Sequence, residues 1–156
     1  RHTRPSDVRN LRAMLDREFP NCELNVEGYP DPAFLSLASE VRADQVTLVP
    51  DDPSQATSDH GWDFEVEHER LKRYVAQLKS NGHRVALFAD ADADQMSFAA
   101  ATRADRVELY TGPYGSSYDA PDQQKSEIER IKNATEKVPN KIILSYTTIN
   151  NSEKFR

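Results

Sequence analysis

Short apolar runs alternate along the chain with longer segments in which apolar residues recur every three or four positions. The five apolar runs have the length and composition of β-strands and occupy residues 22–26, 45–49, 84–89, 106–110 and 141–146. The segments with helical periodicity occupy residues 8–19, 31–41, 63–81, 92–103 and 122–137. Because no Asn-Gly or Asp-Gly hairpin joins two strands, this alternation predicts right-handed βαβ crossovers and a parallel sheet.

Two α/β architectures fit a parallel sheet of about five strands. One is an open, doubly wound sheet, and the other is part of a (β/α)8 barrel of the TIM type. Complete barrels take about 250 residues, so five strands in 156 residues are a little over half of one. The chain begins with Arg and a predicted helix and ends just after a strand, which also favours a partial barrel.

Charge and cysteine content narrow the classes of function. Lys and Arg contribute 20 positive charges and Asp and Glu 26 negative ones, and the resulting net charge of −6 disfavours a nucleic-acid binder. The single cysteine, Cys22, cannot form an internal disulfide, so we expect a reducing, cytoplasmic setting. No apolar run approaches the roughly 20 residues that span a bilayer, and none near the first residue is typical of a signal peptide. We therefore expect no partnership with nucleic acid or membrane.

Residues that follow the strands are candidates for chemistry, because function in parallel α/β folds gathers at the carboxyl ends of the strands. Glu27 follows the first predicted strand, and its carboxylate is expected to project over the end of the sheet. Burial would raise its pKa toward neutrality and make it a general base. The alternative is a solvated glutamate in a loop. Thr57, Asp90 and the pair Thr111-Gly112 occupy similar positions near the ends of the later strands.

Glu108 lies inside the fourth predicted strand, between two apolar residues. Alternation turns its side chain away from them, toward the interior of a barrel or, in an open sheet, toward solvent. The acidic run 90–94 lacks the glycine and glutamate of a calcium loop, so Asp92 is expected to cap the next helix. The four histidines have no ligand spacing with one another, and the five glycines form no phosphate-binding loop. We therefore expect no metal site.

Six segments occur in order over residues 1 to about 120. They are Arg1-His2-Thr3 with Asp7-Val8 and Leu11, Leu24-Asn25-Val26-Glu27-Gly28-Tyr29-Pro30, Val46-Thr47-Leu48-Val49-Pro50, Thr57-Ser58-Asp59-His60-Gly61-Trp62-Asp63, Val85-Ala86-Leu87-Phe88-Ala89-Asp90-Ala91-Asp92 and Val107-Glu108-Leu109-Tyr110-Thr111-Gly112-Pro113-Tyr114. Together they resemble the pyridoxine 5'-phosphate synthase family of the vitamin B6 pathway. We expect residues 1–124 to form a partial barrel of this family. Residues 125–156, which do not resemble it, are expected to add a helix and a strand.

The resemblance implies a (β/α)8 barrel that condenses 1-deoxy-D-xylulose 5-phosphate with 3-amino-2-oxopropyl phosphate. The products are pyridoxine 5'-phosphate, inorganic phosphate and water, and no metal or organic cofactor takes part. Homo-oligomers are implied too, as octamers built from dimers. By the same resemblance Glu27 is the proton acceptor and Glu108 a second carboxylate of the catalytic pocket. The residues expected to bind the phosphorylated substrates are His2, Thr57, Thr111 and Gly112.

Two features of the family have no counterpart in these 156 residues. No histidine follows His83 to serve as the proton donor of the seventh strand, and no glycine follows Gly115 to form the late phosphate sites. We therefore expect the chain alone to be inactive. The alternative function is a non-catalytic fragment or chimera that needs a partner piece to close its barrel. Open strand edges at residues 22–26 and 141–146 predict that the chain self-associates. A third interpretation, an open-sheet domain that binds small molecules, does not explain the six ordered segments.

Overall fold

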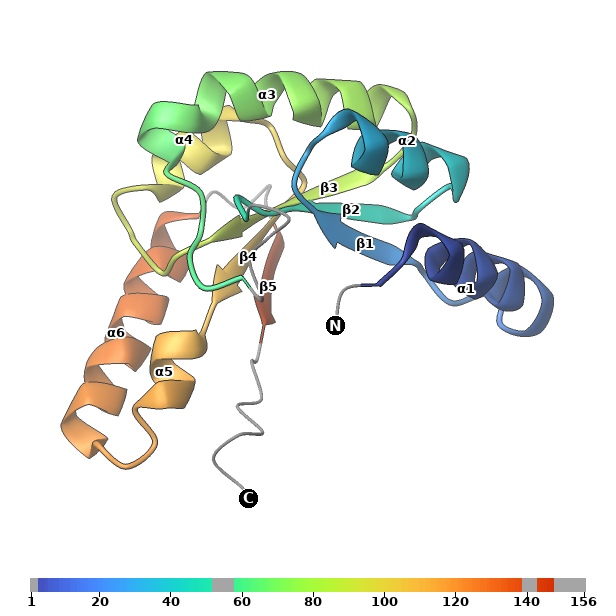
Figure 1. Cartoon of the computed structure of the whole chain (residues 1–156). Helices are drawn as coiled ribbons and strands as arrows, with labels where there is room; N and C mark the ends of the chain where they lie inside the picture. Colours follow the sequence, from blue (N-terminus) through green and yellow to red (C-terminus); the bar gives the residue numbers. More distant parts are fainter. Residues whose placement is uncertain (1–2, 52–57, 139–142, 148–156) are drawn as a thin grey trace.

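The computed structural model describes residues 3–51, 58–138 and 143–147 of the chain. Figure 1 shows helices and strands alternating from the blue amino-terminal end to the red carboxyl-terminal end. The helices are α1 (Pro5–Glu18), α2 (Pro32–Glu40), α3 (Phe64–Ser80), α4 (Met96–Ala101), α5 (Gly112–Ser116) and α6 (Pro121–Lys137). The strands are β1 (Asn25–Gly28), β2 (Gln45–Leu48), β3 (Arg84–Ala89), β4 (Arg106–Tyr110) and β5 (Ile143–Thr147). A helix therefore separates each strand from the next, as predicted, and α5 is an additional short helix.

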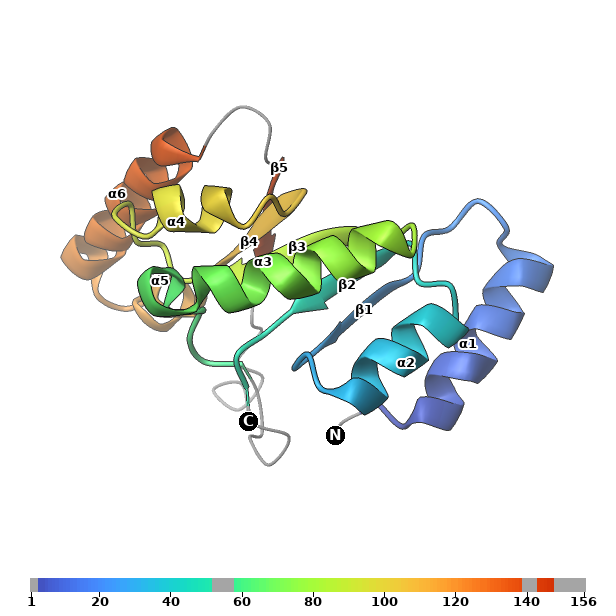
Figure 2. The same cartoon turned by 90° about the horizontal axis from the view of Figure 1, so that it is seen from above.

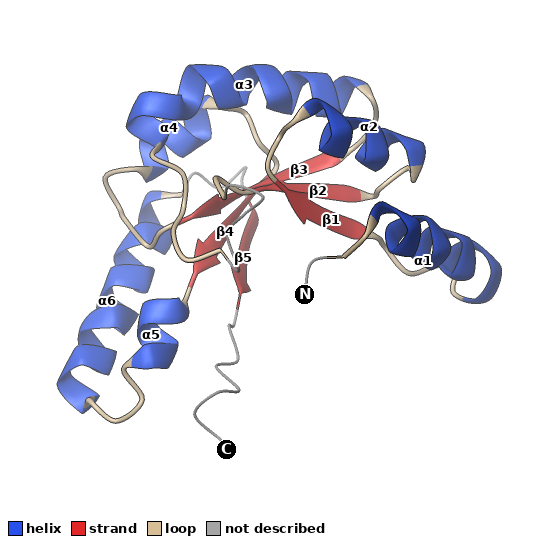
Figure 3. Cartoon of the chain, viewed as in Figure 1, coloured by secondary structure: helices blue, strands red, loops and turns tan. Residues whose placement is uncertain are grey.

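The five strands pair in parallel and in chain order, β1-β2-β3-β4-β5. The helices lie along one side of the curved sheet, with α1 beyond β1 and with α5 and α6 beyond β4 (Figures 1 and 3). Seen from above, α3 lies over the middle of the sheet (Figure 2). A doubly wound sheet reverses its strand order and carries helices on both faces, so the described part of the chain is not one. The predicted parallel α/β class is confirmed.

Alternate side chains of each strand point to opposite faces of the sheet. The side chains on the helix side are apolar and buried: Val26, Val46, Leu48, Val85, Leu87, Val107 and Leu109. They share one core with the buried residues of α3, which are Phe64, Leu71, Val75 and Leu78. The opposite face, which no described helix covers and which is called here the helix-free face, carries mostly polar residues: Asn25, Glu27, Gln45, Thr47, Arg84, Arg106 and Glu108. The sheet thus has one face that stabilises the fold by apolar burial and one that presents polar groups.

The two helices that follow β1 and β2 begin at aspartate caps. The Asp31 carboxylate accepts the N–H of Phe34 at 2.8 Å at the start of α2. The Asp63 carboxylate accepts the N–H of Val66 at 3.2 Å at the start of α3. Such bonds satisfy backbone donors that the first helical turn leaves open. Both helices therefore begin where a polar side chain replaces the missing backbone acceptor.

A short sequence repeat marks the turns that lead into β2 and β4. Residues 42–48 read Arg-Ala-Asp-Gln-Val-Thr-Leu, and residues 103–109 read Arg-Ala-Asp-Arg-Val-Glu-Leu. The first residue of both has a left-handed backbone, with φ of 49° at Arg42 and 64° at Arg103. This conformation costs an L-residue about 1–2 kcal/mol, so the contacts around each turn must hold it in place.

The aspartates of this repeat supply such contacts. The Asp44 carboxylate accepts the N–H of Leu24, just before β1, at 2.7 Å. The Asp105 carboxylate accepts the N–H of Val85 in β3 at 2.9 Å. Each aspartate therefore ties the strand that it precedes to the neighbouring strand, because an ionised carboxylate is a strong acceptor for a backbone N–H.

The predicted boundaries of β1 and α4 require correction. β1 covers residues 25–28 and not 22–26, because the N–H of Cys22 donates to the carbonyl of Phe19 at 2.9 Å in a turn instead of joining the sheet. α4 begins at Met96 and not at residue 92. Asp92 does not cap it, since its carboxylate accepts the N–H of Asp94 at 2.9 Å within the preceding turn.

β1 and β5 are the outer strands of the described sheet. β5 begins at residue 143, and residues 141 and 142 of the predicted strand lie outside the described residues. Each outer strand is bonded to a neighbouring strand on one side within the described chain. A single chain does not test the predicted self-association, which stays a prediction.

Candidate functional site

The carboxyl ends of the parallel strands meet at one edge of the sheet, called here the carboxyl edge. Glu27 lies inside β1, in register with Thr47 of β2. The prediction that it comes directly after the strand is therefore wrong. Because its neighbour Val26 is buried in the core, Glu27 is on the helix-free face. Glu27 is exposed on one side, but the protein atoms around its carboxylate displace water, and this desolvation, followed by the negative charges of Glu108 and Asp51, raises the pKa of Glu27. A carboxylate with a raised pKa is suited to accept a proton.

Glu108, the second predicted catalytic carboxylate, lies in the middle of β4. It is in register with Phe88 of β3, and its neighbours Val107 and Leu109 are fully buried on the helix side. Its side chain is therefore on the helix-free face, as alternation predicts. Among the charges that raise the pKa of Glu27, that of Glu108 has the largest effect. The structure thus brings the two predicted carboxylates to one region.

Asp51 and Ser58, which are not among the predicted site residues, extend this region from the loop after β2. The Ser58 hydroxyl donates to the Asp51 carboxylate and also hydrogen-bonds Glu27, which lowers the pKa of Glu27 against the larger effects that raise it. Asp51 stands three residues after β2, so a search for carboxylates behind each strand would have found it. Ser58 has no comparable signal in the sequence.

A close approach of backbones holds this loop against β3. The indole N–H of Trp62 donates to the carbonyl of Leu48 at 2.9 Å, and its backbone N–H donates to that of Phe88 at 3.1 Å. A Cβ atom at Gly61 would lie 2.1 Å from the backbone nitrogen of Asp90. Only glycine fits such an approach, so residues 61 and 62 fix the loop that carries Ser58.

Arg70 of α3 joins the loops that follow β1 and β2. Its guanidinium carbon lies 5.5 Å from the ring centroid of Trp62 and 5.9 Å from that of Tyr29. Its Nη1 also donates to the Tyr29 hydroxyl at 3.3 Å. Because Tyr29 comes two residues after Glu27, these cation–π contacts hold the segment after Glu27 beside the loop that contains Trp62.

Thr111 and Gly112, predicted to bind substrate, lie where β4 leads into α5. Thr111 directly precedes α5, and its side chain makes no capping hydrogen bond. A Cβ atom at Gly112 would lie 2.2 Å from the Tyr110 ring, so packing explains this glycine. Burial, followed by the charges of Asp59 and Asp90, raises the pKa of Tyr110. The role of Thr111 and Gly112 in substrate binding stays a prediction.

His2 and Thr57 lie outside the described residues, so their predicted contacts with substrate stay predictions too. Nδ1 of His60 lies 2.7 Å from the Asp59 carboxylate in the loop after β2. Within residues 3–51, 58–138 and 143–147, no three His, Cys, Asp or Glu side chains are arranged to hold a metal ion. No helix in these ranges is both long enough and apolar enough to cross a membrane.

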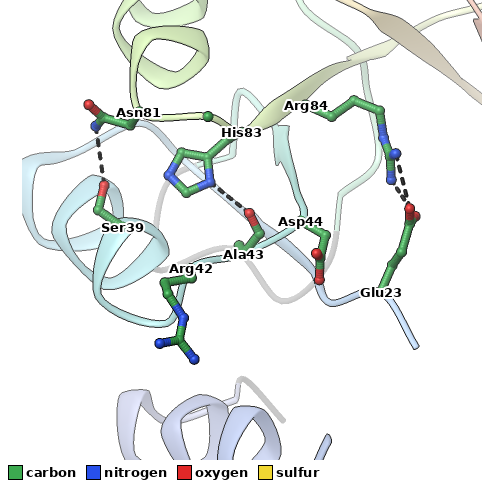
Figure 4. A pocket seen from close by; sticks show the side chains of 9 residues that line it. Glu23, Ser39, Arg42, Ala43, Asp44, Asn81, His83 and Arg84 are labelled. Atoms are coloured by element: carbon green, nitrogen blue, oxygen red, sulfur yellow. Dashed lines mark hydrogen bonds and ion pairs between the residues drawn. The ribbon is translucent and has the colours of Figure 1, made fainter. Parts of the chain in front are cut away.

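A cavity of about 280 Å³ lies at the opposite edge, by the amino ends of β2 and β3 (Figure 4). Its walls come from residues 42–44 and 81–84. Its polar groups are largely engaged: Arg84 pairs with Glu23, and Nδ1 of His83 donates to the carbonyl of Ala43 at 2.7 Å. No described residue that the sequence predicts for the site lines this cavity. The candidate functional site is therefore the carboxyl edge.

Comparison with known proteins agrees with the ordered motifs. Residues 1–144 match the profile of the family described as pyridoxal phosphate biosynthesis protein PdxJ. The chain is 58% identical over 130 residues to a pyridoxine 5'-phosphate synthase of Allorhizobium ampelinum, over 82% of this chain and 52% of that protein. It is 56% identical over 135 residues to the synthase of Chelativorans sp., a match that covers 85% of this chain and 54% of that protein. It is 54% identical over 134 residues to the synthase of Brucella anthropi, a match that covers 86% of this chain and 55% of that protein.

These matches set the extent of the similarity. The chain spans about half the length of the curated relatives it matches. The family profile reaches residue 144, so the prediction that the resemblance stops near residue 125 is wrong. Among solved structures, D-psicose 3-epimerase in the presence of D-fructose has a TM-score of 0.48 and 11% identity, over 95% of this chain and 71% of that chain. A likeness this weak supports no argument about function.

Proposed function

Because the chain belongs to the PdxJ family of pyridoxal phosphate biosynthesis proteins, we propose that it supplies the general base of a pyridoxine 5'-phosphate synthase. The proposed reaction condenses 1-deoxy-D-xylulose 5-phosphate with 3-amino-2-oxopropyl phosphate, without a metal or organic cofactor. Imine formation, dehydration and ring closure require repeated proton transfers to and from positioned groups. The observation that carries the proposal is a carboxylate of raised pKa, Glu27, at the carboxyl edge.

Glu27 is proposed as the proton acceptor and Glu108 as the carboxylate that strengthens it. A solvated glutamate would be a weak base, since water stabilises its charge. At Glu27 the surrounding protein atoms exclude part of that water although the residue is exposed on one side, and the negative charge of Glu108 opposes ionisation further. Proton uptake relieves both effects, so Glu27 binds a substrate proton more strongly than a surface carboxylate would.

The same charges favour one orientation of the substrates. Both charged groups that act on Glu27 within the described residues, Asp51 and Glu108, are negative. A negative field attracts the ammonium form of 3-amino-2-oxopropyl phosphate and repels the phosphate groups of both substrates. The amino end is therefore proposed to approach Glu27, while the phosphates bind farther away. The residues proposed to bind the phosphorylated substrates are His2, Thr57, Thr111 and Gly112.

The sheet is proposed to be part of a (β/α)8 barrel. Sequential parallel strands with helices on one side support this architecture, because a barrel wall has the same arrangement. Closing the barrel would turn the helix-free face, with its polar side chains, toward the interior. The outer strands β1 and β5 would then pair with strands of the other half. A cytoplasmic homo-oligomer, an octamer as the family resemblance implies, completes the proposal.

The test measures pyridoxine 5'-phosphate formation from the two phosphorylated substrates. One sample is the 156-residue chain, and the other is this chain fused to the half of the Allorhizobium ampelinum synthase that it does not cover. We expect product from the fusion and almost none from the chain alone, since about half of the family's length is missing. The complete synthase of that organism is the positive control. A folded fusion that forms no product while this control is active contradicts the proposal.

The second candidate is a non-catalytic fragment or chimera that needs a partner piece. Coverage of only about half of each relative supports it. Within the described residues β1 and β5 each pair on one side only, and this supports it too, because unpaired strand edges promote association. Size-exclusion chromatography over a wide range of concentrations tests the association. A monomer at every concentration contradicts that part of the candidate, and an active 156-residue chain contradicts all of it.

A further inference from the structure

Ser58 lies between two carboxylates, Asp51 and Glu27. Its hydroxyl donates to Oδ2 of Asp51 and is also hydrogen-bonded to Glu27. The other carboxylate oxygen of Asp51, Oδ1, is buried and has no hydrogen-bond partner within the described residues. A serine hydroxyl has a single proton to donate. The two carboxylates must therefore share one donor.

We propose that Asp51, acting through Ser58, is a positioning residue for Glu27, an inference that rests on the proposed function. Asp51 competes with Glu27 for the Ser58 proton. While that proton is directed to Asp51, the ionised Glu27 lacks this donor and binds a substrate proton more strongly. Once Glu27 has taken the proton, its own O–H donates to the Ser58 oxygen. One proton moves from substrate to Glu27, and Ser58 keeps its own.

The link from Asp51 through the Ser58 hydroxyl to Glu27 is called here the bridge. The neighbouring charges distinguish its effect from a general effect of acidic residues. The charged groups that act on Glu27 come from the loop after β2, as Asp51, and from β4, as Glu108. Asp59 is adjacent to Ser58 in sequence, but its charge acts on Tyr110. Asp59 therefore offers a matched control, because it has the same charge and lies in the same loop.

The experiment follows the protonation of Glu27 in the 156-residue chain. Glutamate δ-carbons are labelled with ¹³C, the Glu27 signal is assigned by its loss in Glu27→Gln, and its chemical shift is recorded against pH. We expect Asp51→Asn to move the Glu27 midpoint to lower pH. The substitution removes a negative charge, and the new amide group donates to the Ser58 oxygen and leaves the hydroxyl proton to Glu27.

A double-mutant cycle separates the bridge from simple charge repulsion. In a Ser58→Ala background only the through-space charge of Asp51 remains, so Asp51→Asn is expected to move the midpoint clearly less. Ser58→Thr, which keeps a hydroxyl, should restore the full shift. Asp59→Asn should leave the Glu27 midpoint in place. Should Ser58→Ala fail to fold, Ser58→Cys replaces it, because a thiol is a weak donor.

Two results would overturn the inference. One is a Glu27 midpoint that Asp51→Asn does not change. The other is an equal change with and without the Ser58 hydroxyl, which would assign the whole effect to charge. Because the titration needs no turnover, it decides the bridge even where the fusion forms no product and the proposed function fails. In an active fusion, the acid limb of the kcat/KM profile should move with the midpoint.

Discussion

Glu23, just before β1, and Glu27, within it, lie four residues apart, yet their pKa values shift in opposite directions. The Arg84 guanidinium hydrogen-bonds Glu23 and lowers its pKa, whereas burial, Glu108 and Asp51 raise that of Glu27. A lowered pKa means that folding favours the ionised acid, and a raised pKa means that folding opposes it. At neutral pH the first carboxylate therefore stabilises the fold and the second destabilises it.

The contrast extends to the two edges of the sheet. At the amino edge, shown in Figure 4, carboxylates meet cations. The pairs there include Arg84–Glu23, Arg12–Asp44 at 3.2 Å and Lys79–Asp105 at 2.6 Å. At the carboxyl edge the charges that act on Glu27 within the described residues are negative. One sheet thus carries these ion pairs, which favour stability, at one edge and the carboxylate of raised pKa, which is suited to accept a proton, at the other.

The largest effect is expected from Glu27→Gln, which removes the carboxylate that distinguishes the carboxyl edge from the amino edge. The amide keeps the shape of the side chain and cannot accept a proton, so kcat in the active fusion should fall by about 10²–10⁴. KM should change much less, since the phosphate groups are proposed to bind elsewhere. Steady-state kinetics of the two proteins measures both values, and full activity with Gln at this position would exclude Glu27 as the base.

The thermal stability of Glu27→Gln also tests whether Glu27, unlike Glu23, destabilises the fold at neutral pH. Because the folded-state pKa of Glu27 is raised, the folded protein binds more protons than the unfolded chain between the ordinary and the raised value. Stability therefore falls as pH rises through that window. Glu27→Gln should remove this fall and melt at an equal or higher temperature at neutral pH. Thermal melts at several pH values test this, and a lower melting temperature at neutral pH would contradict it.

The next largest effect is expected from Gly61→Ala at the carboxyl edge. The new Cβ atom would lie 2.1 Å from the backbone nitrogen of Asp90, which directly follows β3, so the loop after β2 must shift. Overpacking of this kind costs about 1–3 kcal/mol. The control is Gly82→Ala near the amino edge, where no atom lies within 4 Å but φ is 88°. Strain alone should cost it about 1 kcal/mol, and urea unfolding compares the two. Equal losses would contradict the close approach.

Asp105→Ala tests the amino edge itself. The substitution leaves the N–H of Val85 without its acceptor and removes the pair with Lys79. The loss of a buried donor's partner costs about 1–3 kcal/mol, which urea unfolding should show as a lower midpoint with an unchanged slope. Asp119→Ala is the control, since this carboxylate is exposed. A variant as stable as the control would mean that the Asp105 carboxylate does not secure β3 to β4.

The smallest effect is expected from Arg103→Gly. Its φ of 64° strains an L-residue and suits glycine. Relief of the strain, reduced by the greater freedom of glycine in the unfolded chain, should leave a gain of about 1 kcal/mol or less. Arg42→Gly has the same backbone benefit but loses the pair with Asp16, so its gain should be smaller. Thermal melts rank the two variants, and a loss at Arg103 would mean that its side chain stabilises the turn.

The faces of the strands could be predicted from sequence, whereas the details of the site could not. The position of Glu108 on the polar face follows from a period of two, which is local. The start of β1 does not, because it depends on whether the N–H of Cys22 bonds within a turn or to another strand. The contact of Ser58 with Asp51 and Glu27 depends on the path of a whole loop. No periodicity along the chain encodes such a path.

The sequential order of the strands has a consequence for the way the fold opens. Each strand bonds to strands that are its neighbours in the chain, so the sheet behaves like a short one-dimensional array. β2 and β3 are bonded on both sides and covered by α3, while β1 and β5 are each bonded on one described side. Local unfolding should therefore begin at the ends and move inward. Amide hydrogen exchange would then be slowest in β2 and β3, and any chain that docks on an outer strand would slow exchange there first.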